Sequence, residues 1–232
     1  MCFSPEASFA SATVLLPFGV YTVKLAARTA PRLWPLALVP CLFGVQQACE
    51  GAVWLGLERG DTALTQPAAR AYLFFALAFW PFWFSTCAAL IEPKRGRRGL
   101  LGVFALLSTG WFWFAYLPVL VDPNAAGACV CRHSIRYTHP DTLVARPSGS
   151  WELRAAYLLT AALPIGCCSL RRVLFVPLAL AVGSAGVAAL VFDYAFTSVW
   201  CLFAAVLSVS IAHSIATAGR SASCVPTPVA IS

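Results

Sequence analysis

The stretch that decides the fold is residues 34–56, WPLALVPCLFGVQQACEGAVWLG. It is predominantly apolar and, as a helix, long enough to cross the roughly 30 Å of hydrocarbon in a bilayer. Its one acidic or basic side chain, Glu50, lies well away from either end. An ionisable group at mid-span costs on the order of 2.5–3.5 kcal/mol, so such groups are usually paired and often functional. The stretch therefore predicts a membrane-spanning helix that bears a candidate site.

The rest of the chain has the same apolar character. Of its 232 residues, 60% are hydrophobic and 11% are charged, whereas a soluble domain carries about 25% charged residues. We expect a single all-α domain over residues 1–219, a bundle of seven transmembrane helices with an outer loop at 122–150 and a flexible tail at 220–232. The predicted spans are about 8–27, 34–56, 68–91, 99–121, 151–169, 173–192 and 195–217.

Basic side chains predict the orientation of this bundle. Alternate connections and the tail hold ten basic residues and one acid, Glu92, whereas the other connections mix basic residues with seven acids. Cytoplasmic connections are enriched in Lys and Arg, so we expect the N-terminus outside and the C-terminus in the cytoplasm. The net charge of +7 lies in these clusters without any recognition motif, which argues against a nucleic-acid partner. The ten basic residues are Lys24, Arg28, Arg32, Lys94, Arg95, Arg97, Arg98, Arg171, Arg172 and Arg220.

Glu50 shares a helical face with other side chains that could form a site. Gln46, Glu50 and Trp54 are spaced i, i+4 and i+8, and Gln47 borders the same face. In the predicted orientation Glu50 lies roughly 9 Å below the outer end of its span. One interpretation is a carboxylate that binds a cation, exchanges a proton or takes part in catalysis. The other is a hydrogen bond that packs this helix against a neighbour.

Asp193 lies on the same side of the membrane, in the tight turn predicted between the sixth and seventh spans. It either caps the seventh helix, because Asp is a preferred N-cap residue, or faces the Glu50 site as a second acid. The two interpretations remain open at the level of sequence.

The outer loop holds side chains that commonly bind metal ions. Cys129, Cys131 and His133 occupy alternate positions and would share one side of an extended strand. Thiolate and imidazole groups bind zinc or copper, so one alternative is a metal ion at the outer face. A second alternative is a disulfide between Cys2 and either loop cysteine in an oxidising compartment, and a third is free thiols. Cys2 and His133 would also cover the Glu50 site.

Two motifs resemble those of a known family. They are the opening MCFSxxASF at residues 1–9 and PCLFGVQQxxEGxxW at residues 40–54. Both are similar to motifs of a family of uncharacterised polytopic bacterial membrane proteins, and the similarity would cover most of the chain. That family has no assigned activity, so the resemblance implies the fold class and a bacterial inner-membrane location but no mechanism.

Two classes of function fit these residues. The first is a small-molecule or ion binder, for transport or sensing, with an outward-facing polar pocket in which the glutamines orient a ligand beside Glu50. The absence of a nucleophile–base pair favours this class. The second is a membrane-embedded metal-dependent hydrolase or redox enzyme that uses Cys129, Cys131 and His133 together with Glu50. The sequence predicts the lipid bilayer as a partner and identifies neither the ligand nor the oligomeric state.

Overall fold

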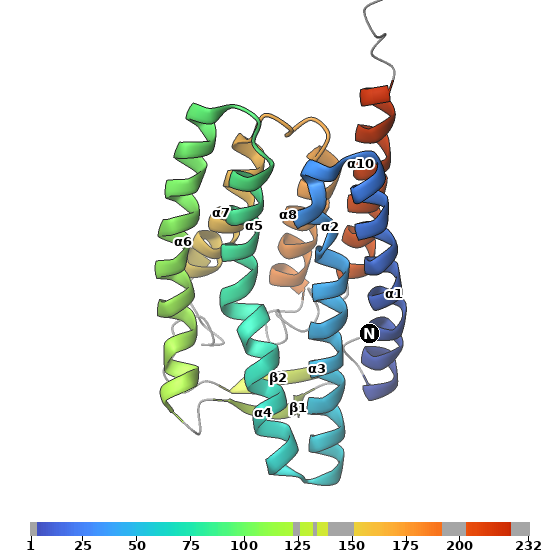
Figure 1. Cartoon of the computed structure of the whole chain (residues 1–232). Coiled ribbons are helices and arrows are strands. Elements are labelled where there is room, and N and C mark those ends of the chain that lie inside the picture. Colours follow the sequence, from blue (N-terminus) through green and yellow to red (C-terminus); the bar gives the residue numbers. More distant parts are fainter. Residues whose placement is uncertain (1–3, 123–125, 132–133, 139–150, 192–202, 224–232) are drawn as a thin grey trace, which may run out of the picture.

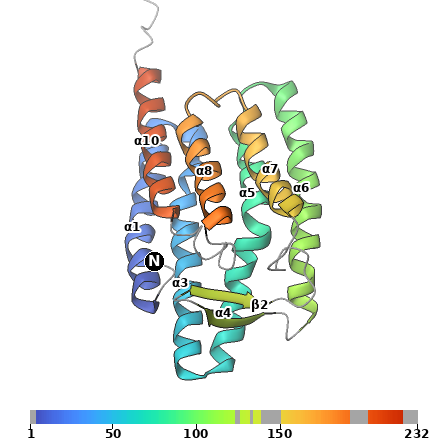
Figure 2. The same cartoon turned by 180° about the vertical axis from the view of Figure 1, so that it is seen from behind.

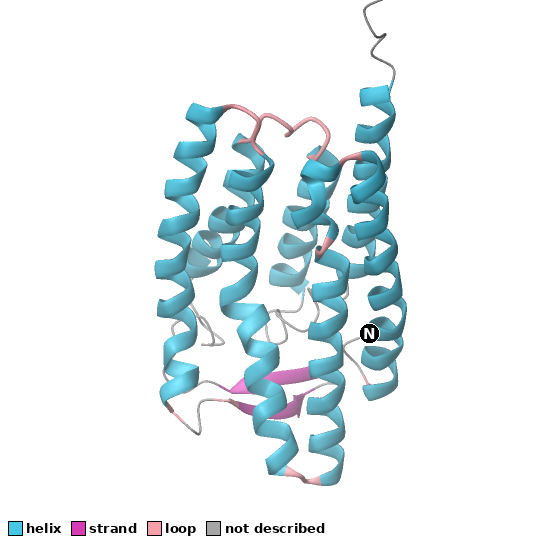
Figure 3. Ribbon diagram, viewed as in Figure 1, coloured by secondary structure: helices cyan, strands magenta, loops and turns pink. Residues whose placement is uncertain are grey.

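Antiparallel helices make up nearly all of the computed structural model, which describes residues 4–122, 126–131, 134–138, 151–191 and 203–223. Figures 1 and 2 show two rows of helices, with α1, α3, the α4–α5 rod and α6 in one row and α10, α8 and α7 in the other. Figure 3 shows a β-hairpin lying across one end of the bundle. The elements are α1 (Pro5–Thr29), η1 (Pro31–Leu33), α2 (Trp34–Ala37), α3 (Val39–Arg59), α4 (Thr62–Leu73), η2 (Phe74–Phe79), α5 (Trp80–Ile91), α6 (Arg95–Val121), β1 (Gly127–Cys131), β2 (Ser134–Thr138), α7 (Trp151–Cys167), α8 (Phe175–Val191) and α10 (Ala204–Ser223).

Local capping explains where several of these helices begin and end. The Ser4 hydroxyl accepts a hydrogen bond from the Ala7 amide at 3.2 Å and caps α1. Helix α3 ends at Gly60, which takes the left-handed conformation at φ +64° that few other residues adopt readily. The next residue, Asp61, then caps α4 by accepting a hydrogen bond from the Leu64 amide at 3.1 Å.

Four helical segments are long and apolar enough to cross a membrane. This confirms the all-helical fold class and supports a membrane protein. Helices α7 and α8 contain shorter apolar stretches, Ala155–Cys167 and Phe175–Ser184. Helix α10 begins only at Ala204. The seven-span topology therefore remains a prediction. The first residues of the predicted seventh span, 195–202, lie outside the described residues. The four long segments are Pro5–Thr29, Pro31–Arg59, Thr62–Ile91 and Arg95–Val121, against predicted spans of 8–27, 34–56, 68–91 and 99–121.

Two prolines inside helices are compensated by neighbouring helices. Proline has no N–H, so Pro81 leaves the carbonyl of Leu77, four residues earlier, without its usual helical donor. The Trp111 indole on α6 donates to that carbonyl at 3.0 Å. Pro164 frees the carbonyl of Thr160 in the same way, and the Ser85 hydroxyl on α5 donates to it at 2.9 Å. A bilayer offers no water for such groups, so these cross-helix bonds are the compensation that a membrane interior requires.

Two apolar clusters form the core, and α3 contributes to both. The cluster toward the α5–α6 connection includes Phe43, Ile91 and Ile215. The cluster toward the hairpin includes Val53 and Tyr137. The residues between Phe43 and Val53 on α3 therefore lie between the two clusters, and these residues include the candidate site.

The two ends of the bundle differ in charge. The connections that follow α1, α5 and α7 lie at one end together with the C-terminal end of α10, and the turn between α3 and α4 lies with the hairpin at the other end (Figure 1). The basic residues assigned above to the cytoplasmic side belong to the first end. The alternation that the positive-inside pattern needs is thus present among the described helices.

Candidate functional site

The structure brings the predicted residues of the second span together on the inner face of α3. Gln46 and Glu50 are fully buried, Gln47 is 1% exposed and Trp54 is 4% exposed. Their spacing along one buried face agrees with the sequence analysis. Their role in binding a ligand or a proton stays a prediction.

Two hydrogen bonds orient the amides of this face. The Gln47 amide Nε2 donates to Glu50 Oε2 at 3.3 Å. The Trp80 indole on α5 donates to Gln46 Oε1 at 2.7 Å, and its ring stacks on Phe43 with centroids 4.0 Å apart. The two glutamines therefore have different hydrogen-bond partners. Gln47 bonds to the Glu50 carboxylate on its own helix, and Gln46 bonds to Trp80 on a neighbouring helix.

Trp80 is a member of this site that the sequence analysis did not identify. It directly follows η2, a segment of π-helix. A π-helical turn shifts the following side chains around the helix axis, and such turns occur frequently at functional sites. The shift places Trp80 against Gln46, which lies 34 residues earlier in the chain. A run of aromatic residues was visible in the sequence, but the partner of Trp80 was not.

Three buried polar atoms near Glu50 have no hydrogen-bond partner. They are Gln47 Oε1, Trp54 Nε1 and Ser8 Oγ. Ser8 precedes Phe9, whose ring abuts Gly51 of α3, so Ser8 lies at the level of the site. An unsatisfied buried polar group costs about 1–3 kcal/mol and is rare enough in native proteins to call for an explanation, such as a bound ion or ligand.

The β-hairpin closes the adjacent end of the bundle. Strand β1 pairs antiparallel with β2, with Ala128 opposite Tyr137 and Cys129 opposite Arg136. Tyr137 stacks on Tyr72 of α4 with ring centroids 4.7 Å apart. Both tyrosines belong to the same apolar cluster as Trp54. The hairpin therefore packs over Trp54, and with it the site, at this end of the bundle.

The outer-loop cysteines lie on this hairpin. Cys129 and Cys131 occupy alternate positions of β1, and neither forms a disulfide with another cysteine of the described residues. His133, Cys2 and Asp193 lie outside the described residues. Within the described ranges, no three His, Cys, Asp or Glu side chains gather as metal ligands. The metal site, the disulfides with Cys2 and the role of Asp193 therefore stay predictions.

Comparison with protein families identifies the chain. The family described as a family of unknown function (DUF6629) matches residues 1–225. The chain belongs to this family. The match confirms the predicted resemblance to an uncharacterised family with no assigned activity. Comparisons with curated proteins and with solved structures give no match, so any proposal about function has to come from the geometry of the chain itself.

Proposed function

We propose that this chain is a seven-span protein of the bacterial inner membrane that binds a small cation, or exchanges a proton, at Glu50. The observation that carries the proposal is the arrangement of Gln47, whose amide is held by the Glu50 carboxylate while its buried carbonyl oxygen has no partner. A carboxylate and an unpaired amide oxygen side by side are both hydrogen-bond acceptors. They attract a cation or a proton donor rather than an anion.

The surroundings of Glu50 strengthen such an attraction. The site lies between two apolar clusters and out of contact with solvent. Electrostatic interactions are stronger in a low-dielectric interior than in water, and acids buried in membrane proteins commonly mark ion or proton pathways. The indole of Trp54 also lies on the same face and offers a surface for a cation. Transport and sensing both need such a binding step.

The charge difference between the two ends of the bundle supports the proposed orientation. A reporter fusion after Gly96, at the start of α6, should report the cytoplasm, and one after Gly127, at the start of β1, should report the external side. We expect this result because the basic residues surround the first position and the mixed-charge connections surround the second. Alkaline phosphatase and green fluorescent protein fusions give complementary readouts. Reports from the same side would contradict the topology.

The cation proposal predicts a stability that depends on the ion. Thermal unfolding of the full chain in mild detergent is measured by tryptophan fluorescence in sodium, potassium, methylammonium or choline chloride at equal ionic strength. We expect one of the smaller cations to raise the midpoint relative to choline, because binding to the folded state stabilises it by about 2.7 kcal/mol at a hundredfold excess over Kd. Glu50→Gln should fold and lose this response, since the amide keeps the shape but not the charge.

Glu58→Gln is the matched control for this experiment. Glu58 lies on the same helix but is exposed near its end, so its loss should leave the cation response as in the unaltered protein. A cation response that persists in Glu50→Gln at full size would remove Glu50 from the proposed function. An absent response in the unaltered protein to all three smaller cations, together with an unchanged midpoint from pH 5 to pH 8, would reject ion and proton binding alike.

A further inference from the structure

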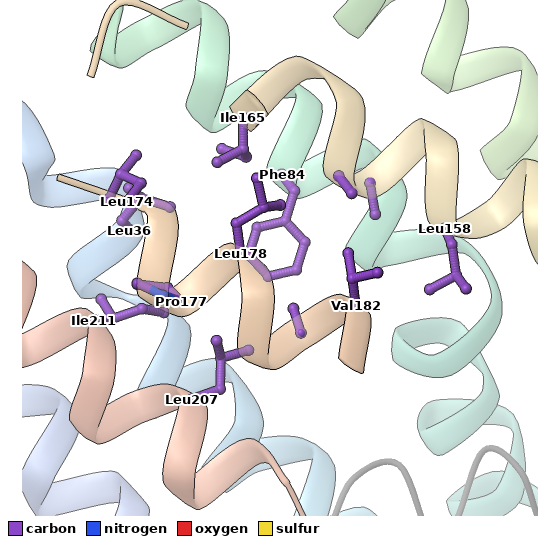
Figure 4. Close-up of a pocket in the computed structure, with 13 residues that line it drawn as sticks. Leu36, Phe84, Leu158, Ile165, Leu174, Pro177, Leu178, Val182, Leu207 and Ile211 are labelled. Atoms are coloured by element: carbon purple, nitrogen blue, oxygen red, sulfur yellow. The ribbon is translucent and has the colours of Figure 1, made fainter. Parts of the chain in front are cut away.

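An apolar pocket lies toward the basic end of the bundle, among residues of the apolar cluster that includes Phe43. Figure 4 shows side chains of α2, α5, α7, α8 and α10 pointing into a common space. The hollow has a cavity volume of about 50 Å³, within about 540 Å³ of empty space that includes its opening. Leu174 and Ile165 line its part nearest the α7–α8 turn, and Val182 and Leu207 line the part farther from that turn. From Leu174 to Val182 the pocket follows α8 for roughly 12 Å at 1.5 Å per residue.

The lining of this pocket indicates the chemistry of its occupant. Every side chain that lines it is apolar. Water does not fill such a space well, because a buried water needs two to four polar partners. An empty apolar hollow also deprives its walls of dispersion contacts. A hydrocarbon chain satisfies both requirements.

The pocket opens toward the outside of the bundle, where a membrane would supply that chain. Val182 lines the pocket and is itself 45% exposed. On the same helix, Phe175 and Val176 are 66% and 54% exposed. In a bilayer, which the proposed function assumes, these side chains would face lipid. A lipid tail could then enter from the side without crossing a polar surface.

Positive charge lies next to one end of the pocket. Arg171 and Arg172 lie in the turn between α7 and α8, three and two residues before the lining residue Leu174, and both are exposed. In the part of the chain that the structure describes, neither guanidinium has a carboxylate partner. Arg97 of α6 reaches the same turn, where it donates to Ser169 Oγ at 3.4 Å. Guanidinium groups bind phosphate oxygens in bidentate geometry, and basic pockets between membrane helices bind anionic head groups.

We propose that this pocket binds one anionic phospholipid, with an acyl chain against Leu178 and Leu207 and the phosphate at Arg171 and Arg172. The two parts of the site match the two parts of the lipid, since the apolar hollow continues from a turn that bears the arginines. Nothing in this proposal requires Glu50. It can therefore fail while the cation proposal stands, and the reverse also holds.

Native mass spectrometry of the full-length, delipidated protein tests this site directly. Phosphatidylglycerol and phosphatidylcholine with identical acyl chains are added in turn. We expect one phosphatidylglycerol to be retained per chain, with at least tenfold less phosphatidylcholine. In the double variant Arg171→Gln/Arg172→Gln this preference should fall severalfold, because only the head-group contacts are lost. Both residues are exposed, so the variant should fold normally.

A second variant tests the apolar half of the site. Ala161→Phe places a ring in the space that the acyl chain would occupy, because Ala161 lines the pocket, and it should abolish retention of both lipids. Leu163→Phe is its control on the outward face of α7, where Leu163 is 46% exposed. Arg28→Gln is the control for charge, since Arg28 is exposed at the same end on α1, which contributes no lining residue. Equal retention of the two lipids, or unchanged retention in Ala161→Phe with its fold intact, would overturn the proposal.

Discussion

Replacing Glu92 by alanine is expected to lower the free energy of unfolding by about 3–5 kcal/mol, on the order of 10 °C in the unfolding midpoint. The Glu92 carboxylate follows α5 and is out of contact with solvent. Its Oε1 accepts hydrogen bonds from the Lys94 amide at 2.9 Å and the Ser169 hydroxyl at 2.7 Å, and its Oε2 accepts one from the Ser169 amide at 2.7 Å. The variant would leave these donors unpaired and separate the end of α5 from the α7–α8 turn.

The same carboxylate predicts a loss of stability in acid. Burial raises the pKa of Glu92, but hydrogen bonds from Ser169 and from the backbone of Lys94, with the charge of Arg97, hold that pKa below its ordinary value. A lowered pKa in the folded state means that the stabilising contribution is complete above the unfolded pKa of about 4.3. It is lost as the pH falls through the lower folded value. The unaltered protein should therefore lose stability below about pH 4.

Unfolding in detergent at pH 7 and at several values between pH 5 and pH 3 checks both effects. Glu92→Gln should lower the unfolding midpoint less than Glu92→Ala does, because the glutamine amide keeps one acceptor oxygen. Its midpoint should approach that of the unaltered protein as the pH falls. Glu152→Gln, an exposed acid of α7, is the matched control and should change little. If the difference in unfolding midpoint between Glu92→Gln and the unaltered protein were the same at every pH in this range, the charge of Glu92 would not contribute to stability.

The sequence was informative where a property depends on neighbours along the chain. The apolar length of each of the first four spans predicted four long helices, and their observed ends lie within six residues of the predicted ones. The 3.6-residue period placed Gln46, Glu50 and Trp54 on one face, and all three are buried. The strand that carries Cys129 and Cys131 was not predicted in this way, because the sequence analysis treated residues 122–150 as an outer loop, whereas Gly127–Cys131 forms β1.

Properties that depend on contacts between distant segments could not be predicted in the same way. The sequence showed Glu92 only as the single acid among the basic connections. Its hydrogen bonds could not be predicted, because its partner Ser169 lies 77 residues later. Trp80 reaches Gln46 through a π-helical segment, which depends on packing rather than on local residue preference. The shape of the apolar pocket likewise comes from five helices at once.

Gly19→Ala is the second variant that we expect to lower stability strongly, because α1 and α3 approach each other closely at Gly19. A Cβ atom at Gly19 would lie 2.5 Å from the backbone nitrogen of Cys41 and would also collide with its Sγ. Backbone atoms cannot move aside as a flexible side chain can. Overpacking a core usually costs about 1–3 kcal/mol, and a collision with backbone belongs at or above the upper end of that range. The contact also sets the spacing between α1 and the helix that bears Glu50.

A series of glycine variants separates this effect from helix propensity. Gly102 on α6 has open space around its position, so Gly102→Ala should be neutral or stabilising by up to about 1 kcal/mol. Gly51→Ala would meet the ring of Phe9 at 2.8 Å. It should have an intermediate cost, since a ring can shift. Midpoints of thermal unfolding and monodispersity in detergent should rank the variants as Gly102→Ala, Gly51→Ala and Gly19→Ala, from most to least stable.

The origin of the cost at Gly19 can be tested with one further change. Cys41→Ala removes the sulfur but leaves the backbone nitrogen in place, so the double variant Gly19→Ala/Cys41→Ala should remain severely destabilised. Full rescue would mean that only the side chain of Cys41 opposes the added methyl group, and that the two helix backbones can separate at little cost. The absence of rescue would show that the close approach of the two backbones, rather than the Cys41 side chain, opposes the added methyl group.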